Sequence, residues 1–254
     1  MAVTQEVRLD VSICFDSNTL PWQPFRPAGL ADGLYLHPLR RLESGRLRSA
    51  VLNIPAGWNS AKDLRLLARL HFFVISGDLK LGDLTLTENS YVVQPEKSVM
   101  PPFGSTNGCE IIVIADGTPA FDDAIGDASG DNALILPNAY DVPYHQPAHD
   151  GWKLDGFQHR TIWQDPVTGA DTRLLVIPPG FEGRGLNYHP VNEEIFCLSG
   201  DIGPDDIRLM KPGWYLWNPA YGVHGWHEHS NGGSTVLEWH DGDWGMTMYE
   251  IENN

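Results

Sequence analysis

The strongest constraint on the fold of this sequence is an internal repeat of short apolar segments. The segment "HFFVISGDL" at 71–79 returns as "EIFCLSGDI" at 194–202, and "NSYVVQP" at 89–95 returns as "GWYLWNP" at 213–219. A separation that stays nearly constant over several segments is typical of two successive copies of one structural module. The chain is therefore predicted to be two copies of one β module.

The segments themselves indicate an all-β fold. Runs rich in β-branched and aromatic residues, such as "CEIIVIAD" and "RLLVIPPG", recur along the chain and are separated by Gly, Pro, Asn and Asp. The sequence holds 26 Gly and 19 Pro, and its longest stretch with a helical period is "SAKDLRLLARL" at 60–70. This pattern favours antiparallel sandwiches or small barrels with few helices. The acidic Gly/Ser/Asp stretch at 122–132 is interpreted as a linker between an N-terminal module, 1–121, and a C-terminal module, 133–254.

Composition excludes several classes of partner. The chain has 17 Lys and Arg against 33 Asp and Glu, a net charge of -16, and no basic cluster that could follow a nucleic-acid backbone. Its apolar runs fall far short of the roughly 20 residues of a membrane span, and the N-terminus lacks a signal-peptide core. Cys14, Cys109 and Cys197 are isolated and predicted to be buried thiols. We expect a cytoplasmic protein that binds neither nucleic acid nor membrane.

The second copy contains a candidate metal site. Asn187 and His189 share one face of an extended segment, and Glu193 reaches the same point after a bend. His224 lies on a later segment that strand pairing can bring opposite His189. Two imidazoles and one carboxylate suit Fe(II) and also accept Mn, Ni or Zn. The predicted ligands of one divalent ion per chain are therefore His189, Glu193 and His224.

These residues resemble the two conserved motifs of the cupin superfamily. In the first motif three residues separate His189 from Glu193, and six separate Glu193 from Gly200. In the second, the segment that begins at Gly213 carries His224 at the histidine of the motif. The resemblance implies two tandem cupin barrels of the jelly-roll type, with a metal in the mouth of the barrel, and it covers nearly the whole chain.

The sequence departs from the cupin pattern at four positions, of which only Asn187, in place of the first histidine, bears on the chemistry. Gly180 lies one residue early, Gly222 one residue late, and Glu228 stands where the pattern has asparagine. Asn187 can coordinate weakly, donate a hydrogen bond to a bound water or leave a vacancy, and we favour the hydrogen bond because an amide is a poor ligand for such metals. Glu194 competes with Glu193 as the ligand, but the six-residue gap favours Glu193 and leaves Glu194 outward, solvated or paired with a cation.

A narrower resemblance concerns the segments that precede each module. "TLPWQPFRPAG" and "DVPYHQPAHDGW" are similar to the lead-in strand and turn of cupin domains related to those of bacterial zinc-binding anti-sigma factors. That subgroup is functionally mixed, so the similarity implies a fold more than an activity.

The first copy lacks the metal ligands. The repeat projects Asn187, His189, Glu193 and His224 onto positions that are all apolar in the first copy. These positions are Leu64, Leu66, Leu70 and Met100. Apolar side chains fill a module interior without the cost of burying unpaired polar groups, so the first module is predicted to be metal-free. His71 projects onto Glu194 and is predicted to be a non-ligand.

Aromatic residues crowd the second motif. Trp226 shares strand parity with His224 and is predicted to line a pocket beside the metal, with Tyr215 as a weaker second and Asn187 as a third. His227 and His229 are expected to lie on the opposite face, in a solvated or interface role.

A divalent ion with this ligand set stabilises negative charge on a bound enolate, carboxylate or phenolate. We expect an Fe(II) dioxygenase of a diketone, hydroxyketone or phenolic compound, with Glu193 as the candidate catalytic group and Tyr215 as a possible second. A Zn, Mn or Ni isomerase, cyclase, lyase or hydrolase remains an alternative. A sensor module and a storage-like protein with two cupin domains are non-enzymatic alternatives. The partners expected are a small-molecule substrate and a second copy of the chain in a homodimer.

Overall fold

A computed structural model describes residues 11–123, 132–146, 148–149, 152–153 and 155–250. These residues form antiparallel strands joined by turns, and their only helical segments are the short 3-10 helices η1 (Ser17–Thr19) and η2 (Ala139–Asp141). The prediction of an all-β chain with few helices is confirmed, and the segment at 60–70 forms strands, not a helix. In the part of the chain described, no helix has the length and hydropathy of a membrane span.

The N-terminal unit, residues 20–141, is built on a seven-stranded sheet. Its strands, in spatial order, are β14 (Leu134–Leu136), β9 (Tyr91–Gln94), β6 (Leu70–Gly77), β12 (Cys109–Ala115), β4 (Leu47–Ile54), β3 (Leu34–Arg41) and β2 (Gln23–Phe25). Two small sheets complete the unit: β10 (Val99–Met100), β5 (Leu64–Leu66) and β13 (Phe121–Asp123) in one, and β11 (Phe103–Gly104), β7 (Leu79–Leu81) and β8 (Leu84–Leu86) in the other. Leucine, isoleucine, valine and phenylalanine side chains from all three sheets form its buried core.

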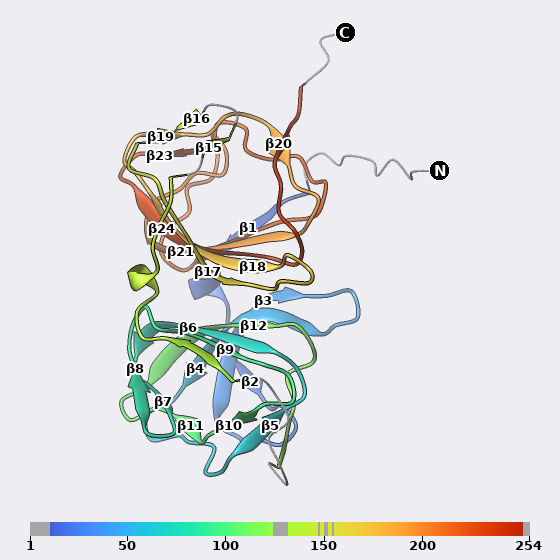
Figure 1. Cartoon of the computed structure of the whole chain (residues 1–254), viewed down its shortest axis with the longest axis vertical. Helices are drawn as coiled ribbons and strands as arrows, with labels where there is room; N and C mark the ends of the chain where they lie inside the picture. The colour runs from blue at the N-terminus through green and yellow to red at the C-terminus, as the bar shows by residue number, and fades with distance from the viewer. Residues whose placement is uncertain (1–10, 124–131, 147, 150–151, 154, 251–254) are drawn as a thin grey trace. The chain divides into compact units, whose positions relative to one another are not determined.

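The C-terminal unit comprises residues 142–254 together with 1–19. Its six-stranded sheet runs in the order β1 (Ile13–Asp16), β22 (Trp214–Asn218), β21 (Glu193–Gly200), β24 (Ser234–His240), β18 (Asp171–Ile177) and β17 (Gln158–Gln164). Three two-stranded sheets accompany it: β15 (Ala148–His149) with β16 (Trp152–Lys153), β19 (Phe181–Glu182) with β23 (His229–Ser230), and β20 (Asn187–Tyr188) with β25 (Thr247–Met248). Figure 1 shows the blue strand β1 among the orange and red strands of this unit.

The two large sheets repeat the same strand order. In the N-terminal sheet the order is β14-β9-β6-β12-β4-β3, and in the C-terminal sheet it is β1-β22-β21-β24-β18-β17. Strands at the same place in the two orders are counterparts in the sequence repeat. The register agrees as well, because Leu70 pairs with Ala115 in the first unit and Glu193 pairs with His240 in the second. The sequence repeat therefore corresponds to a repeat of strand pairing.

The unit boundaries differ from the boundaries expected from sequence. β1 lies at the start of the first sequence copy but pairs with β22 of the C-terminal unit. β14 follows the expected linker but pairs with β9 of the N-terminal unit. Each unit thus takes one edge strand from the other sequence copy. A linear division into 1–121 and 133–254 does not describe this exchange. Most of the expected linker, 124–131, lies outside the described residues.

The repeated "SGD" motif ends β6 and β21 in the same way. Gly77 and Gly200 have φ of 82° and 75°, and an added Cβ would lie 2.0 Å from the carbonyl oxygen of Gly108 or of Gly233. Only glycine fits such a position without moving the backbone. The following aspartate braces the facing loop: Asp78 accepts hydrogen bonds from the backbone N–H groups of Thr106 (2.8 Å) and Asn107 (2.9 Å).

We predict that Asp78→Ala lowers the free energy of unfolding by about 1–2 kcal/mol at neutral pH, because two charge-assisted hydrogen bonds are lost. These hydrogen bonds, the Thr106 N–H foremost, lower the pKa of Asp78. A lowered folded-state pKa gives stability that is present above the unfolded pKa and lost as pH falls through the folded value. The difference between wild type and variant should therefore shrink under acid conditions. Urea unfolding at neutral and acidic pH measures it, and equal stability at neutral pH would contradict the bracing role.

Candidate metal centre

Three chain segments bring the predicted ligands together. His189 follows β20, Glu193 is the first residue of β21, and His224 lies in the segment after β22. Asn187 exchanges two backbone hydrogen bonds with His224, both 2.9 Å, and this bridge brings the segment of His224 against the segment of His189. The pairing between the segments of His189 and His224, which the sequence analysis assumed, is thus present in the structure.

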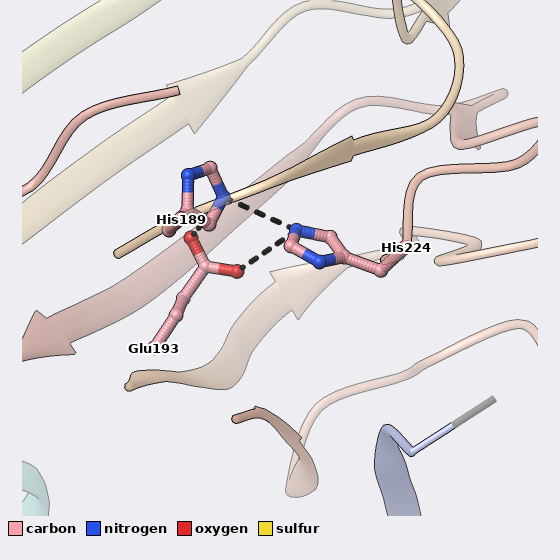
Figure 2. Close-up of side chains that lie close together, drawn as sticks. All are labelled: His189, Glu193 and His224. Atoms are coloured by element: carbon pink, nitrogen blue, oxygen red, sulfur yellow. Dashed lines mark hydrogen bonds and ion pairs between the residues drawn. The ribbon is translucent and has the colours of Figure 1, made fainter. Parts of the chain in front are cut away.

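The three side chains point at one another, as Figure 2 shows. The Nε2 atoms of His189 and His224 lie 3.1 Å apart. Oε1 of Glu193 lies 3.4 Å from Nε2 of His189, and its Oε2 lies 3.5 Å from Nε2 of His224. His189 and Glu193 are buried, and His224 is partly exposed. The structure therefore brings together all three predicted metal ligands.

Backbone carbonyls fix the tautomers of both histidines. Nδ1 of His189 lies 3.0 Å from the carbonyl oxygen of Gly245, and Nδ1 of His224 lies 2.9 Å from that of Gly222. A carbonyl oxygen only accepts, so each Nδ1 carries the hydrogen and donates it. The Nε2 atoms of both rings then point at each other and at the Glu193 carboxylate. These three groups repel one another unless a proton or a metal cation lies between them.

The acceptor spacing fits a first-row divalent metal. With ligand distances of about 2.1 Å, angles from roughly 90° to 110° place ligand atoms about 3.0 to 3.4 Å apart. The three measured separations fall in or next to this range. The Nδ1–H bonds to backbone carbonyls are also the usual means by which proteins orient metal-binding imidazoles. The residues present therefore fit the metal that the ligand set implies.

The charge states suit cation binding. Burial lowers the pKa of His189 to about 4, although the charge of Glu193 opposes this shift. Burial alone would raise the pKa of Glu193, but His189, His240 and His224 together hold it well below its usual value. At neutral pH the site thus presents an unprotonated imidazole and an ionised carboxylate.

The corresponding positions of the N-terminal unit are apolar and buried. Leu64 pairs with Met100, as Asn187 pairs with His224, so the projection made from sequence matches the strand register. Leu64, Leu66, Leu70 and Met100 are at most 2% exposed and belong to one apolar core. Among the residues that the structure describes, no metal-ligating side chain takes the equivalent place in this unit.

A second polar group beside the site was missed from sequence. His240 pairs with Glu193 across β21 and β24, and its Nε2 lies 3.4 Å from Oε1 of Glu193 and 3.3 Å from Oε1 of Glu238. Its Nδ1 lies 2.6 Å from Oδ1 of Asp171, and Oδ2 of Asp171 accepts from Nε of Arg173 at 2.7 Å. Local spacing gives no hint of this group, because its members meet only through the register of three strands.

The repeat does carry a signal for the second polar group. Leu70 pairs with Ala115 where Glu193 pairs with His240, and Val113 pairs with Ala50 where Glu238 pairs with Arg173. Glu193, His240, Glu238 and Arg173 therefore have apolar counterparts in the twin unit, whereas the counterpart of Asp171 is Arg48. Burial opposes protonation of His240, but hydrogen bonds to Asp171 and Glu193 outweigh it and raise the pKa of His240 to about 9. Glu193, Glu238 and His240 lie close enough to hold a cation, but the protonated imidazole and the cation of Arg173 already balance these carboxylates.

Two sequence interpretations of the same strand face are corrected. The Tyr215 hydroxyl donates to Oε2 of Glu194 at 2.7 Å, and both side chains are 1% exposed. Glu194 is therefore outward from the site but buried and hydrogen-bonded, not solvated. Tyr215 lies on that opposite face and does not line the cavity described next. The twin unit repeats the contact, since the Tyr91 hydroxyl lies 2.7 Å from Nδ1 of His71.

A cavity of about 670 Å³ opens onto the candidate ligands. Asn187 and Trp226 line it, as expected from sequence, although His224 forms only an isolated bridge and the chain turns at Trp226 and His227, so no strand carries Trp226. Nδ2 of Asn187 donates to the carbonyl oxygen of Gly185 at 3.1 Å, and its Oδ1 is buried without a partner among the described residues. The free group of Asn187 is therefore an acceptor, whereas the sequence interpretation favoured a donor.

The rest of the cavity wall is largely apolar. Its apolar side chains are Phe157, Leu175, Ile177, Phe181, Leu186, Ile195, Ile202, Leu216, Val223, Val236 and Met246. Glu228, at the position where the cupin pattern has asparagine, also faces this cavity. Burial, reinforced by the charges of Glu193 and Glu238, raises the pKa of Glu228 to about 8. Its carboxyl group is therefore mostly protonated at neutral pH and can donate a hydrogen bond.

Comparison with known proteins assigns a family. A family model described as "Domain of unknown function (DUF4437)" matches residues 43–245, which include all three candidate ligands. The chain belongs to this family. Among curated proteins, none matches the sequence. The DUF4437 description names no activity, so the function must be inferred from the site.

Solved structures relate the DUF4437 chain to the cupin fold. A structure from Nostoc punctiforme described as a "putative dioxygenase" superposes with a TM-score of 0.80 at 20% identity, over 95% of this chain and 87% of that chain. Protein Ylba from E. coli gives 0.60 at 14% identity, over 99% and 97%. A mutant of salicylate 1,2-dioxygenase from Pseudoaminobacter salicylatoxidans, in complex with gentisate, gives 0.54 at 11% identity, over 81% and 72%. These neighbours confirm the cupin fold, while the narrower similarity to anti-sigma-factor cupins stays a prediction.

We predict that the DUF4437 chain binds about one divalent ion per chain and that His189→Ala, Glu193→Ala or His224→Ala removes it. Loss of a ligand should weaken binding beyond the about 10- to 100-fold that loss of an outer hydrogen bond costs. Elemental analysis after gentle purification measures the metal content.

His227→Asn provides a matched control in the same segment, because asparagine tolerates the left-handed backbone at this position (φ 59°). It should retain the metal. Equal metal content in all four variants would show that the ion binds elsewhere.

Proposed function

We propose that the protein is a metal-dependent cupin enzyme, and most specifically an Fe(II) dioxygenase of a small organic substrate. In this proposal the two units are tandem cupin barrels, and the C-terminal barrel carries the metal. The observation that supports it best is the cluster of three converging acceptors, His189 Nε2, His224 Nε2 and an oxygen of Glu193, at the wall of a large cavity.

The ligand set favours iron among the possible metals. Two neutral imidazoles and one carboxylate leave open positions on the ion, and this set is typical of Fe(II) oxygenases. When bound, such an ion supplies a place where a substrate oxygen and O2 can meet and where developing negative charge is stabilised. Of the solved structures with this fold, one is described as a "putative dioxygenase" and another as a salicylate 1,2-dioxygenase in complex with gentisate. That likeness supports the proposal without naming the substrate.

Neighbouring residues hold Glu193 in place for this chemistry. Asn218 Nδ2 donates to Oε2 of Glu193 at 2.7 Å. The protonated His240 approaches Oε1 from the other side. The two contacts leave the carboxylate little rotational freedom and keep it ionised. Trp244 covers His189, with ring centroids 4.9 Å apart, and limits the access of water to that imidazole.

The cavity indicates the class of substrate. Its apolar wall suits a flat or hydrophobic body, and its volume is within the range of small-molecule sites. Three polar atoms of cavity-lining residues are buried without partners among the described residues: His159 Nε2, Asn187 Oδ1 and Trp244 Nε1. A substrate with hydroxyl and carbonyl groups can satisfy them. We therefore favour a diketone, hydroxyketone or phenolic compound. These are the same substrate classes that the metal ligands favour.

We predict that the Fe(II)-loaded protein consumes O2 with at least one member of a panel of β-diketones, α-hydroxyketones and dihydroxybenzenes. Glu193→Ala and His224→Ala should reduce the rate to background, because each removes a metal ligand. An oxygen electrode under otherwise identical conditions measures the rate, and mass spectrometry of the product with ¹⁸O2 establishes whether both atoms are incorporated.

Tyr215→Phe is a control variant close to the candidate metal ligands but outside the cavity. The variant removes the hydroxyl that contacts Glu194 on the far face of β21, so the rate should stay near that of wild type. Turnover of the panel by Zn-loaded protein without O2 would contradict the dioxygenase assignment, and O2 uptake that survives in Glu193→Ala would contradict the site.

A further inference from the structure

Ser12, near the start of the chain, contacts the candidate metal centre of the C-terminal unit. It precedes β1, and its hydroxyl donates to Oδ1 of Asn218 at 2.6 Å. Nδ2 of Asn218 donates in turn to Oε2 of Glu193 at 2.7 Å. Asn218 is 2% exposed, and Ser12 lines the cavity. A hydrogen-bond chain thus joins residue 12 to a ligand more than 180 residues away in sequence.

The chain of hydrogen bonds has a fixed direction. Because a side-chain amide can rotate by half a turn, Asn218 can direct either its oxygen or its NH₂ group at Glu193. A carboxylate only accepts, so the NH₂ group of Asn218 faces Glu193, and the hydroxyl of Ser12 donates to the amide oxygen on the other side. In the opposite orientation the amide oxygen would face an ionised carboxylate, which is repulsive. Ser12 therefore holds Asn218 in the orientation that supports the charge on Glu193.

The twin unit lacks all parts of this chain. β14 occupies the place of β1, since Leu134 pairs with Val93 where Ile13 pairs with Trp217. The residue before β14 is Ala133, and it stands where Ser12 precedes β1.

The counterparts of Asn218 and Glu193 in the twin unit do not form this hydrogen bond either. Gln94 pairs with Leu70 where Asn218 pairs with Glu193. Nε2 of Gln94 donates within its own turn, to Ser98 Oγ at 2.8 Å and to the carbonyl oxygen of Val99 at 3.2 Å. Serine, asparagine and ligand occur together in one unit and are absent together from the other, so the fold itself does not require them.

We propose that Ser12 is a positioning residue of the metal centre and that β1 is recruited to the C-terminal unit in part to supply it. The inference rests on the metal site of the proposed function. Ser12 acts through Asn218: it anchors the amide oxygen, the amide NH₂ group holds Oε2 of Glu193, and the carboxylate is thereby preorganised for the ion.

The test compares Ser12→Ala with Ser17→Ala in the full chain, with Co(II) as the probe. Ser17 lies in η1, directly after β1, and its hydroxyl donates to the carbonyl oxygen of Gly213 at 2.5 Å, away from the ligands. Both variants lose one serine hydroxyl of the same segment. Competition with a chelator gives the Co(II) affinity, the visible spectrum of Co(II) reports the ligand field, and thermal unfolding of the apo-protein reports any general loss of stability.

Ser12→Ala should weaken Co(II) binding about 10-fold and alter the visible bands, which is the lower end of the usual cost of losing a hydrogen bond behind a ligand. Ser17→Ala should lower the unfolding midpoint of the apo-protein at least as much and leave affinity and spectrum unchanged. Ser12→Thr, which keeps a hydroxyl, should restore most of the affinity.

Three results would overturn the inference. Ser12→Ala with wild-type affinity and spectrum would remove only the role of Ser12, and the proposed function would stand. An equal loss of affinity in Ser17→Ala would show that the effect is general destabilisation. A wild-type chain that binds no Co(II) would overturn the proposed function together with this inference.

Discussion

The site depends on one electrostatic constraint: two imidazole nitrogens and one carboxylate converge on a point that only a positive charge can stabilise. Backbone carbonyls accept the Nδ1–H groups of His189 and His224, so the two Nε2 atoms lie 3.1 Å apart and 3.4 to 3.5 Å from the Glu193 carboxylate. Such an arrangement is unfavourable by itself and becomes favourable around a cation. The surrounding hydrogen bonds of Asn218 and His240 then maintain a geometry that the fold alone does not need.

The N-terminal unit serves as an internal control for this interpretation. It has the same strand order and register, and it fills the same point with Leu66, Leu70 and Met100. The repeat changes several positions together, ligand and support alike, from hydrocarbon to polar. The same strand arrangement thus surrounds an apolar core in the N-terminal unit and a polar cluster in the C-terminal unit, where a cation would neutralise the negative charge. The difference locates the candidate metal site in one half of the chain.

Sequence alone predicted the parts of the site that depend on local spacing. The all-β class, the repeat and the convergence of His189, Glu193 and His224 follow from periodicity and from short motifs. The sequence could not place Tyr215, because the face of a strand is set by its pairing, and the register of Glu193 with Asn218 turns Tyr215 outward. The role of Ser12 could not be predicted for the same reason, since its segment belongs to the C-terminal unit only through the pairing of β1 with β22. His240 was detectable, because its counterpart in the repeat is alanine.

Anomalous diffraction from crystals of the metal-loaded protein, recorded at the absorption edge of the bound metal, tests the central claim most directly. The account predicts one strong peak per chain, between Nε2 of His189, Nε2 of His224 and the carboxylate of Glu193, and no peak beside Leu66 and Leu70. A peak in the N-terminal unit, or none between the three acceptors under saturating metal, would contradict it.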